Sequence, residues 1–219
     1  MTPTPAVDLL APLRAGLDLP RVPQQARSRQ KRDALLAAAE RLFAAQGYEA
    51  VTADSIAAAA GVSTGTFYAY FRNKRQLFLT LYLVCLEGIL ALGIAAVEWG
   101  PDTRATVRAL VQRALEHDML FYGLRRAWAE LRPRDPEIAA ADAQVNALFY
   151  SQILTAAQRA AALGLLWPDV DIDTTCWYIT VLLDRAWEGE PPPGTITPAA
   201  RAARHDALAD LIYHALFRA

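Results

Sequence analysis

A short helix predicted over residues 64–71 carries the side chains best suited to contact another molecule. Phe67 and Phe71 are four residues apart, so they lie on one face of this helix and can fill a core. The opposite face and its flanks hold small, hydroxyl and aromatic side chains: Gly65, Thr66, Tyr68 and Ala69. This outward face is uncharged and offers hydrogen-bonding and apolar contacts. The chemistry it predicts is recognition of another molecule rather than catalysis.

Two short helices around Gly61 form a helix-turn-helix pattern, with a longer helix in front of them. The first helix of the pair begins at Thr52, a good N-cap residue, and ends at Gly61, which permits a tight turn. Ser63 is the N-cap residue of the second, and a supporting helix covers about residues 29–46. In such an arrangement the last helix projects its outer face into the major groove of DNA.

The stretch from Thr52 to Phe78, together with Leu42-Phe43 and Gly47-Tyr48, resembles the DNA-binding region of TetR/AcrR-type transcriptional regulators. The resemblance covers about residues 29–80, with many positions matching at fixed spacing. It implies a DNA-binding domain over residues 28–75 and a helical ligand-binding and dimerisation domain over residues 76–219. The function it implies is a ligand-responsive regulator, most often a repressor that binds a pseudo-palindromic operator as a dimer. A ligand-activated regulator of the same fold is the alternative.

The resemblance also implies roles for individual residues of the pattern. Thr52 matches a helix cap that touches backbone phosphate, and Lys74 matches a basic residue that pairs with phosphate at the start of the next helix. The remaining matches are groove-entering or phosphate-reaching positions: Ser63, Thr64, Gly65, Thr66, Tyr68 and Tyr70. Thr52 and Ser63 can also serve as helix caps alone. Position 64 is often larger or basic in the family, so DNA shape is expected to contribute to specificity.

The first third of the chain is its basic part. Residues 1–80 contain ten Lys or Arg and six Asp or Glu, whereas the rest is acidic, and the whole chain has a net charge of −1. Residues 1–27 contain five prolines and are predicted to form a mobile extension. Arg27 and Arg29 at its end can act as an arm that touches phosphates, or belong to a solvated helix start.

The remaining sequence predicts further helices and no strands, so the fold class is all-α. The expected helices cover residues 73–99, 103–116, 118–131, 136–163, 173–188 and 198–218. Aromatic and polar side chains on the middle helices are either a core stripe or the lining of an effector pocket: Tyr82, His117, Phe121, Tyr122, Arg125, Trp128, Asn146, Phe149 and Tyr150. The expected effector is small and largely apolar or aromatic, with an anionic group for Arg125.

The last two predicted helices carry more apolar surface than one chain easily hides. By the resemblance, family members pair such helices across a two-fold axis. The residues expected at this dimer interface are Ile179, Leu183, Trp187, Leu208, Leu211, Ile212 and Ala215. A dimer also places two recognition helices about one DNA turn apart, as a pseudo-palindromic site requires.

Other classes of protein are disfavoured. There is no GxSxG elbow, glycine-rich phosphate loop or HExxH motif, so no enzyme activity and no cofactor are expected. Two cysteines and three histidines show no metal-ligand spacing. Leu77 to Val97 is long and apolar enough to span a membrane, but Glu87 at its centre favours a buried core helix. A cytoplasmic protein without membrane contact is expected. A helical scaffold that binds only protein remains an alternative, although it leaves the basic first third unexplained.

Overall fold

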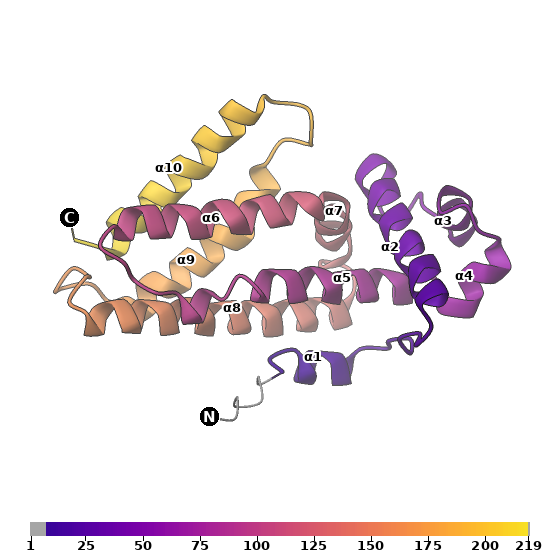
Figure 1. The fold of residues 1–219 in the computed structure, drawn as a ribbon, viewed down its shortest axis with the longest axis horizontal. Helices are drawn as coiled ribbons and strands as arrows, with labels where there is room; N and C mark the ends of the chain where they lie inside the picture. The colour runs from indigo at the N-terminus through magenta and orange to yellow at the C-terminus, as the bar shows by residue number, and fades with distance from the viewer. Residues whose placement is uncertain (1–7, 219) are drawn as a thin grey trace.

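A computed structural model describes residues 8–218, except for the side chain of Trp187. Within these residues the chain forms ten α-helices and two short 3-10 helices, and the only β-type pairing is an isolated bridge between Leu166 and Phe217 (Figure 1). The predicted all-α class is confirmed. The helices that form one end of the molecule are α2 (Ala26–Gln46), α3 (Ala53–Ala59) and α4 (Thr64–Tyr70).

The predicted caps hold the two short helices in place. The Thr52 hydroxyl accepts a hydrogen bond from the Ser55 amide, and the Ser63 hydroxyl accepts one from the Thr66 amide. Gly61 between the helices has a φ of +68°, a conformation that favours glycine. The side chains of Ile56 and Phe67 are completely buried, which fixes the angle between the helices.

Helix α5 (Lys74–Leu90) connects this end of the molecule to the rest. Its first turn packs beside α2, and its later turns lie within the helical bundle (Figure 1). It ends earlier than predicted, because Gly93 adopts a φ of +70° and the chain continues into a 3-10 helix, η1 (Ile94–Ala96). Lys74–Ala96 is the one stretch in the described chain long and apolar enough to cross a membrane, and 56% of its most apolar window is buried. Most of this stretch is α5, which packs into the core of the fold.

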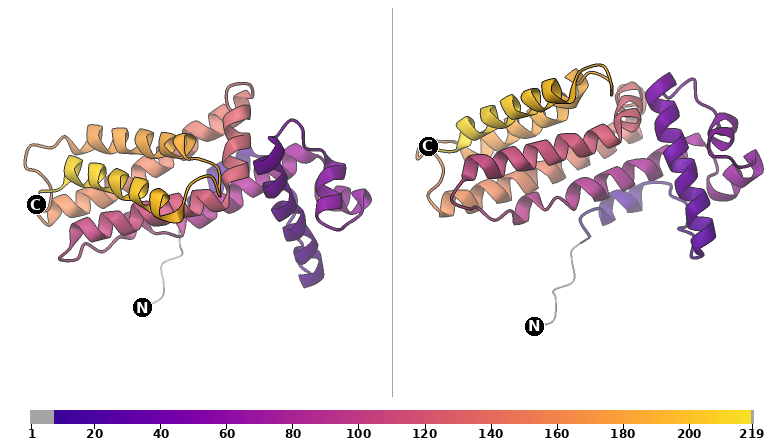
Figure 2. Two further views of the ribbon diagram at one scale, coloured as in Figure 1. Left: turned by 90° about the horizontal axis from the view of Figure 1, so that it is seen from above. Right: turned by 45° about the horizontal axis from the view of Figure 1, so that its top comes forward.

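The second domain is a bundle of longer helices at the other end of the molecule (Figure 2). Its helices are α6 (Thr103–Leu120), α7 (Tyr122–Leu131), α8 (Pro136–Ala162), α9 (Ile172–Ala186) and α10 (Pro198–Leu216). Helix α10 packs on α6, and α9 packs on α8. The break between α6 and α7 falls at Phe121 instead of near residue 117. The reason lies outside these helices, because the Glu40 carboxylate of α2 accepts hydrogen bonds from the first amides of α7.

The structure differs from the expected mobile extension over residues 8–27. This segment contains a short helix, α1 (Ala11–Gly16), which runs beside α5 (Figure 2). Leu10 and Leu13 are 3% and 6% exposed and belong to the same core cluster as α5. Pro12 lies in the first turn of the helix, where a proline is compatible with helix formation. Residues 1–7 of the predicted extension lie outside the described residues.

Candidate nucleic-acid interface and ligand cavity

The outer face of α4 presents Tyr68 to solvent. Its side chain is 56% exposed, and its ring packs edge-on against the buried ring of Phe67. This contact limits the orientations available to the tyrosine while its hydroxyl stays accessible. Gly65 and Ala69 are exposed on the same helix. By contrast, Tyr70 is half-buried and packs against the core of the domain.

The hydroxyl groups at the start of α4 are held by local hydrogen bonds. Thr64 donates to a carboxylate oxygen of Asp54 at 2.7 Å, which ties α4 to α3. The hydroxyl oxygens of Ser63 and Thr66 lie 2.9 Å apart. These side chains therefore stiffen the helix start in the absence of DNA, and the exposed ones can still accept a further hydrogen bond.

Lys74 has a structural role that the sequence does not reveal. Its ammonium group donates to the backbone carbonyls of Tyr48 and Val51 at 2.7 and 2.8 Å, and it lies 4.0 Å from the centre of the Tyr48 ring. Partial burial lowers the pKa of Lys74. The sequence alone predicts that Lys74→Ala leaves the melting temperature nearly unchanged. The structure reverses that expectation, because the substitution leaves two carbonyls without their donor.

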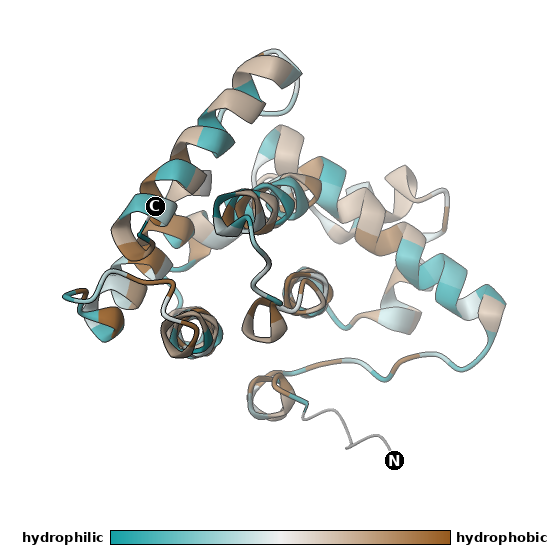
Figure 3. Cartoon of the chain, turned by 60° about the vertical axis from the view of Figure 1, so that its left-hand side comes forward, coloured by the Kyte–Doolittle hydropathy of each residue, from teal (hydrophilic) through white to brown (hydrophobic). Residues whose placement is uncertain are grey.

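Basic side chains surround the recognition helix, although several are paired within the chain. Arg27 and Arg29 are exposed in the first turn of α2, which is strongly hydrophilic (Figure 3). Arg29 donates to the backbone carbonyl of Gln24 at 2.8 Å. Arg72, which the sequence analysis did not single out, is 69% exposed at its side chain and pairs with Asp18 of the N-terminal segment. The N-terminal segment thus lies beside the outer face of α4.

Two neighbouring cavities, called chambers below, lie among the helices of the second domain. The two chambers have volumes of about 80 and 90 Å³ and share four wall residues: Ile94, Ala114, Ile153 and Leu183. Four of the nine predicted pocket residues line the second chamber, namely Tyr82, Arg125, Asn146 and Phe149. An engineered apolar cavity of about 150 Å³ binds benzene, and the volumes of the two neighbouring chambers add up to a similar size.

The other five predicted pocket residues do not line either chamber. Trp128 is 2% exposed and stacks on Tyr82 with ring centres 3.7 Å apart, so it belongs to the core. Tyr150 donates a hydrogen bond to Asp173, and Tyr122 lines a shallow surface depression beside α9. His117 and Phe121 stack on each other at the end of α6, with ring centres 5.1 Å apart. The predicted pocket residues therefore include some, such as Trp128, that belong to the core of the protein.

Arg125 already has two acidic neighbours within the protein. Its guanidinium lies 3.7 Å from Asp184 and 4.0 Å from Asp118. Burial opposes its positive charge, but the neighbouring acidic groups outweigh that effect and raise the pKa of Arg125. The expected anionic group of the effector therefore has to compete with two carboxylates of the protein.

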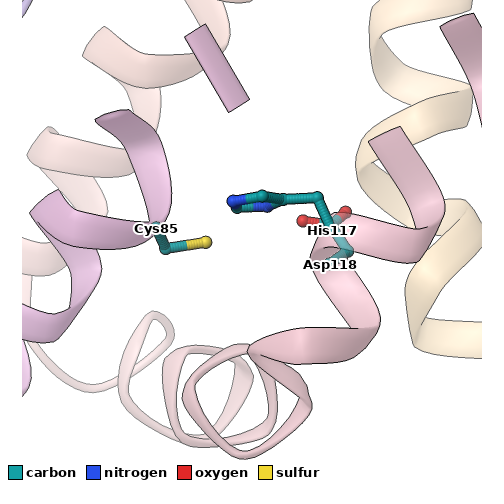
Figure 4. Close-up of side chains that lie close together, drawn as sticks. All are labelled: Cys85, His117 and Asp118. Carbon is teal, nitrogen blue, oxygen red and sulfur yellow. The ribbon is translucent and has the colours of Figure 1, made fainter. Parts of the chain in front are cut away.

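Cys85 of α5 lies close to the adjacent residues His117 and Asp118 of α6, although about thirty residues separate them in the sequence. Their sulfur, nitrogen and oxygen atoms all lie within 4.8 Å of one another (Figure 4). Burial raises the pKa of the Cys85 thiol and lowers that of His117. Arg125 influences Cys85 and pairs with Asp118, and this positive charge opposes a bound metal ion. Metal-ligand spacing could not reveal this cluster, because its members come from two helices.

The predicted dimer residues divide into exposed and buried sets. Leu211 and Ala215 are exposed and Leu208 is half-buried. Ile179 and Ile212 are buried in the core of their own chain, and Leu183 lines both chambers of the cavity, so these three are unsuited to an interface. The exposed apolar residues of α9 are instead Trp177, Tyr178 and Val181. The side chain of Trp187 lies outside the described residues.

The two domains meet at a close contact between α2 and α7. Glu40 accepts a hydrogen bond from the Leu124 amide at 2.7 Å and a shorter one from the Gly123 amide. A Cβ atom at Gly123 would lie 2.2 Å from the Glu40 carbonyl oxygen and 2.5 Å from the Ala44 nitrogen. Only glycine allows the helices to approach this closely. Because Arg125 follows directly, the cavity is linked to the helix-turn-helix through α7 as well as α5.

Fold and site together describe an all-helical protein with a helix-turn-helix at one end and a bundle of longer helices, with internal cavities, at the other. The family described as "Bacterial regulatory proteins, tetR family" matches residues 35–81, the region of α2 to α5. Residues 35–81 therefore form a DNA-binding domain of the TetR type.

Curated relatives and a solved structure agree with this assignment. The transcriptional activator FasR of Mycolicibacterium smegmatis is 33% identical over 98 residues, which cover 43% of this chain and 45% of FasR. The repressor AcnR of Corynebacterium diphtheriae is 27% identical over 70% of this chain and 77% of its own length. A SmeT–triclosan complex shares the fold with a TM-score of 0.65 at 19% identity, over 86% of this chain and 92% of that one. The matched region thus spans less than half of FasR.

Proposed function

We propose that this protein is a cytoplasmic, homodimeric regulator that binds a pseudo-palindromic operator and is released by a small, largely apolar or aromatic effector. The observation that carries this proposal is the double role of α5. Its first residue, Lys74, fastens the helix-turn-helix domain, and Tyr82 and Cys85 further along it line the cavity. A ligand in the cavity therefore contacts the same helix that holds the DNA-binding domain.

The proposed DNA-binding surface consists of α4 and the basic residues around it. Tyr68 and the start of α4 enter the major groove, and Arg27, Arg29 and Arg72 lie near the phosphates. The recognition helix itself has no charged residue. Affinity should therefore come mainly from the surrounding basic side chains and specificity from short contacts and DNA shape.

The proposed dimer is built on α9 and α10. Trp177, Tyr178, Val181 and Leu211 leave apolar side chains exposed, at fractions of 39–63%. Exposed apolar residues on neighbouring elements indicate an interaction surface. A two-fold axis at this surface would leave the two helix-turn-helix domains free at the far end of each chain.

The proposed switch is a shift between two arrangements of the domains. Without effector, the dimer holds its recognition helices at operator spacing. A ligand that prefers another arrangement of α5 and α7 reduces DNA affinity by the difference in its affinity for the two states. The second candidate is a ligand-activated regulator of the same fold, and the name of FasR as a transcriptional activator shows that a similar chain can activate transcription.

Selection from genomic DNA tests the proposal. Purified protein is incubated with fragmented DNA of its source, and bound fragments are recovered and sequenced. Enrichment of one or a few palindromic sites by the wild-type chain, but not by Tyr68→Ala, is the expected result. Recovery of the same fragments by both proteins would contradict the role of α4. A DNA affinity that does not fall as salt rises would instead favour the protein-binding scaffold, because phosphate contacts release counterions.

A further inference from the structure

The two chambers of the cavity differ sharply in chemistry. The described residues that line the first are all apolar, among them Trp99, Val107, Ile212 and Phe217. The second contains three carboxylates and one guanidinium, from Asp118, Asp142, Asp184 and Arg125. The chambers are neighbours that share four wall residues, and a movement of these side chains would let one molecule occupy both, with an apolar body in the first and a polar group in the second.

The polar chamber contains more negative than positive charge. Among the described residues, Arg125 is the one basic residue on its lining. Arg132 reaches the chamber from outside, 3.7 Å from Asp142 and 3.5 Å from Asp184. Three carboxylates thus face two guanidinium groups. Arg185 also lies 3.7 Å from Asp184, but it pairs more closely with Glu188 at 2.8 Å.

The three carboxylates are not equally satisfied. Asp142 accepts hydrogen bonds from the Trp128 indole at 2.7 Å and from the Asn146 amide at 3.3 Å. Asp118 and Asp184 accept none from the described residues, and their nearest cationic nitrogens are 3.5–4.0 Å away. Charge-assisted hydrogen bonds are about 2.7–2.9 Å long. Both carboxylates therefore have unused acceptor capacity beside the cavity.

Burial makes the ionised forms of Asp118 and Asp184 unfavourable in the protein without a ligand. It raises the pKa of both Asp118 and Asp184, which shows that their negative charge is poorly stabilised. A ligand cation or N–H donor between them would stabilise that charge. A ligand carboxylate would instead take Arg125 away from two acidic partners and leave their charges buried and less compensated.

We propose that the effector is a lipophilic amine, whose protonated nitrogen binds between Asp118 and Asp184 and whose hydrocarbon part fills the apolar chamber. This inference rests on the proposed effector function of the cavity, and it proposes a cationic group in place of the anionic group expected from Arg125 alone. The ammonium donates hydrogen bonds to the two carboxylates without displacing Arg125. A divalent metal ion fits less well, because it lacks a part that fills the apolar chamber.

Three ligands that differ only in their polar group test the proposal: octylamine, octanol and octanoate. Their binding to the full-length protein is measured by isothermal titration calorimetry at neutral pH. Octylamine is expected to bind at least about tenfold more tightly than octanoate, as a charge-assisted hydrogen bond implies. Octanoate affinity equal to or above that of octylamine would overturn the proposal, and this comparison needs no variant.

Matched variants locate the two ends of the ligand. Asp184→Asn is expected to lower octylamine affinity at least about tenfold while octanol affinity changes little. Ala114→Phe, in the shared wall, should weaken all three ligands. Asp169→Asn changes an exposed aspartate and should leave all affinities unchanged. Thermal melts of each variant check folding, and equal octylamine affinity in folded Asp184→Asn and wild type would contradict the site.

Operator binding is measured separately, so the two proposals can fail independently. Tight octylamine binding by a protein that selects no operator would support the ligand class and contradict the regulatory function. Release of operator DNA by octanoate but not by octylamine would support the regulatory function and contradict the ligand class.

Discussion

Glu40 provides a quantitative test of how the two domains are joined. Its carboxylate lies between α2 and α7, where burial raises its pKa from 4.5 to about 7, and the amides of Gly123 and Leu124 only partly oppose this shift. Each pKa unit corresponds to about 1.4 kcal/mol. The shift therefore amounts to ~3 kcal/mol of folding free energy that depends on the ionisation of a single side chain.

The sign follows from proton binding. An acid whose pKa is higher in the folded state holds more protons there than in the unfolded chain between the two pKa values. The contribution of Glu40 to stability is thus fully present below pH 4.5 and is lost as the pH rises through 7. Glu40→Gln removes this titration, and the neutral amide keeps a similar size. The free energy of unfolding of wild type minus variant should fall by ~3 kcal/mol from pH 4.5 to 7.5.

Urea denaturation at one fixed protein concentration measures this difference at a series of pH values. The test is how the difference in the free energy of unfolding changes with pH. Its absolute size is not diagnostic, because the glutamine amide cannot accept from both backbone amides of α7. Glu116→Gln, an exposed glutamate on α6, is the control. A constant difference between wild type and Glu40→Gln across this range would refute the account of the joint between α2 and α7.

Three further substitutions test other parts of the structure. Tyr68→Ala should weaken operator binding at least about fivefold, measured by fluorescence anisotropy, with little change in melting temperature, since the side chain is mostly exposed; unchanged affinity would remove Tyr68 from the interface. Lys74→Ala should lower the free energy of unfolding by about 1–3 kcal/mol in urea titrations, because two carbonyls lose their donor; an unchanged value would show that these bonds add no stability. Leu211→Glu should raise the dimer dissociation constant at least about a hundredfold, measured by light scattering, because a charge would be buried in the interface. The control variant, Leu120→Glu on α6, should leave this constant unchanged. An intact Leu211→Glu dimer would place the interface elsewhere.

The helix-turn-helix domain could be predicted in detail because its signals are local. Caps at Thr52 and Ser63 and a turn at Gly61 lie within a few residues of the helices that they define. Short-range hydrogen bonding decides these features. The same is true of the Pro136 and Pro198 helix starts, which the structure shows as expected.

The features that the sequence did not reveal depend on packing between distant segments. Because residues 1–27 contain five prolines, a mobile extension was expected there. The structure instead has a short helix whose Leu10 and Leu13 are buried against the core of the fold. The sequence shows that Lys74 is positively charged, but only the fold shows that two backbone carbonyls accept hydrogen bonds from it. The end of α6 depends on Glu40, some eighty residues away in the chain.

Faces of a helix were also hard to assign. A periodic apolar stripe tells which residues share a face, but not whether that face meets the core, a cavity or another chain. For this reason Trp128 was predicted in the pocket and lies in the core, and Ile179 was predicted in the dimer interface and is buried in its own chain. The exposed side of the same helix instead carries Trp177 and Tyr178.

Footprinting on a selected DNA site most directly tests the central claim that a dimer places two recognition helices in successive major grooves. The account predicts two protected half-sites about 10 bp apart, centre to centre, with two chains bound per site by light scattering. It also predicts that Tyr68→Ala loses protection in both half-sites together. Protection of one continuous stretch without two-fold symmetry, or binding of a single chain, would contradict the account.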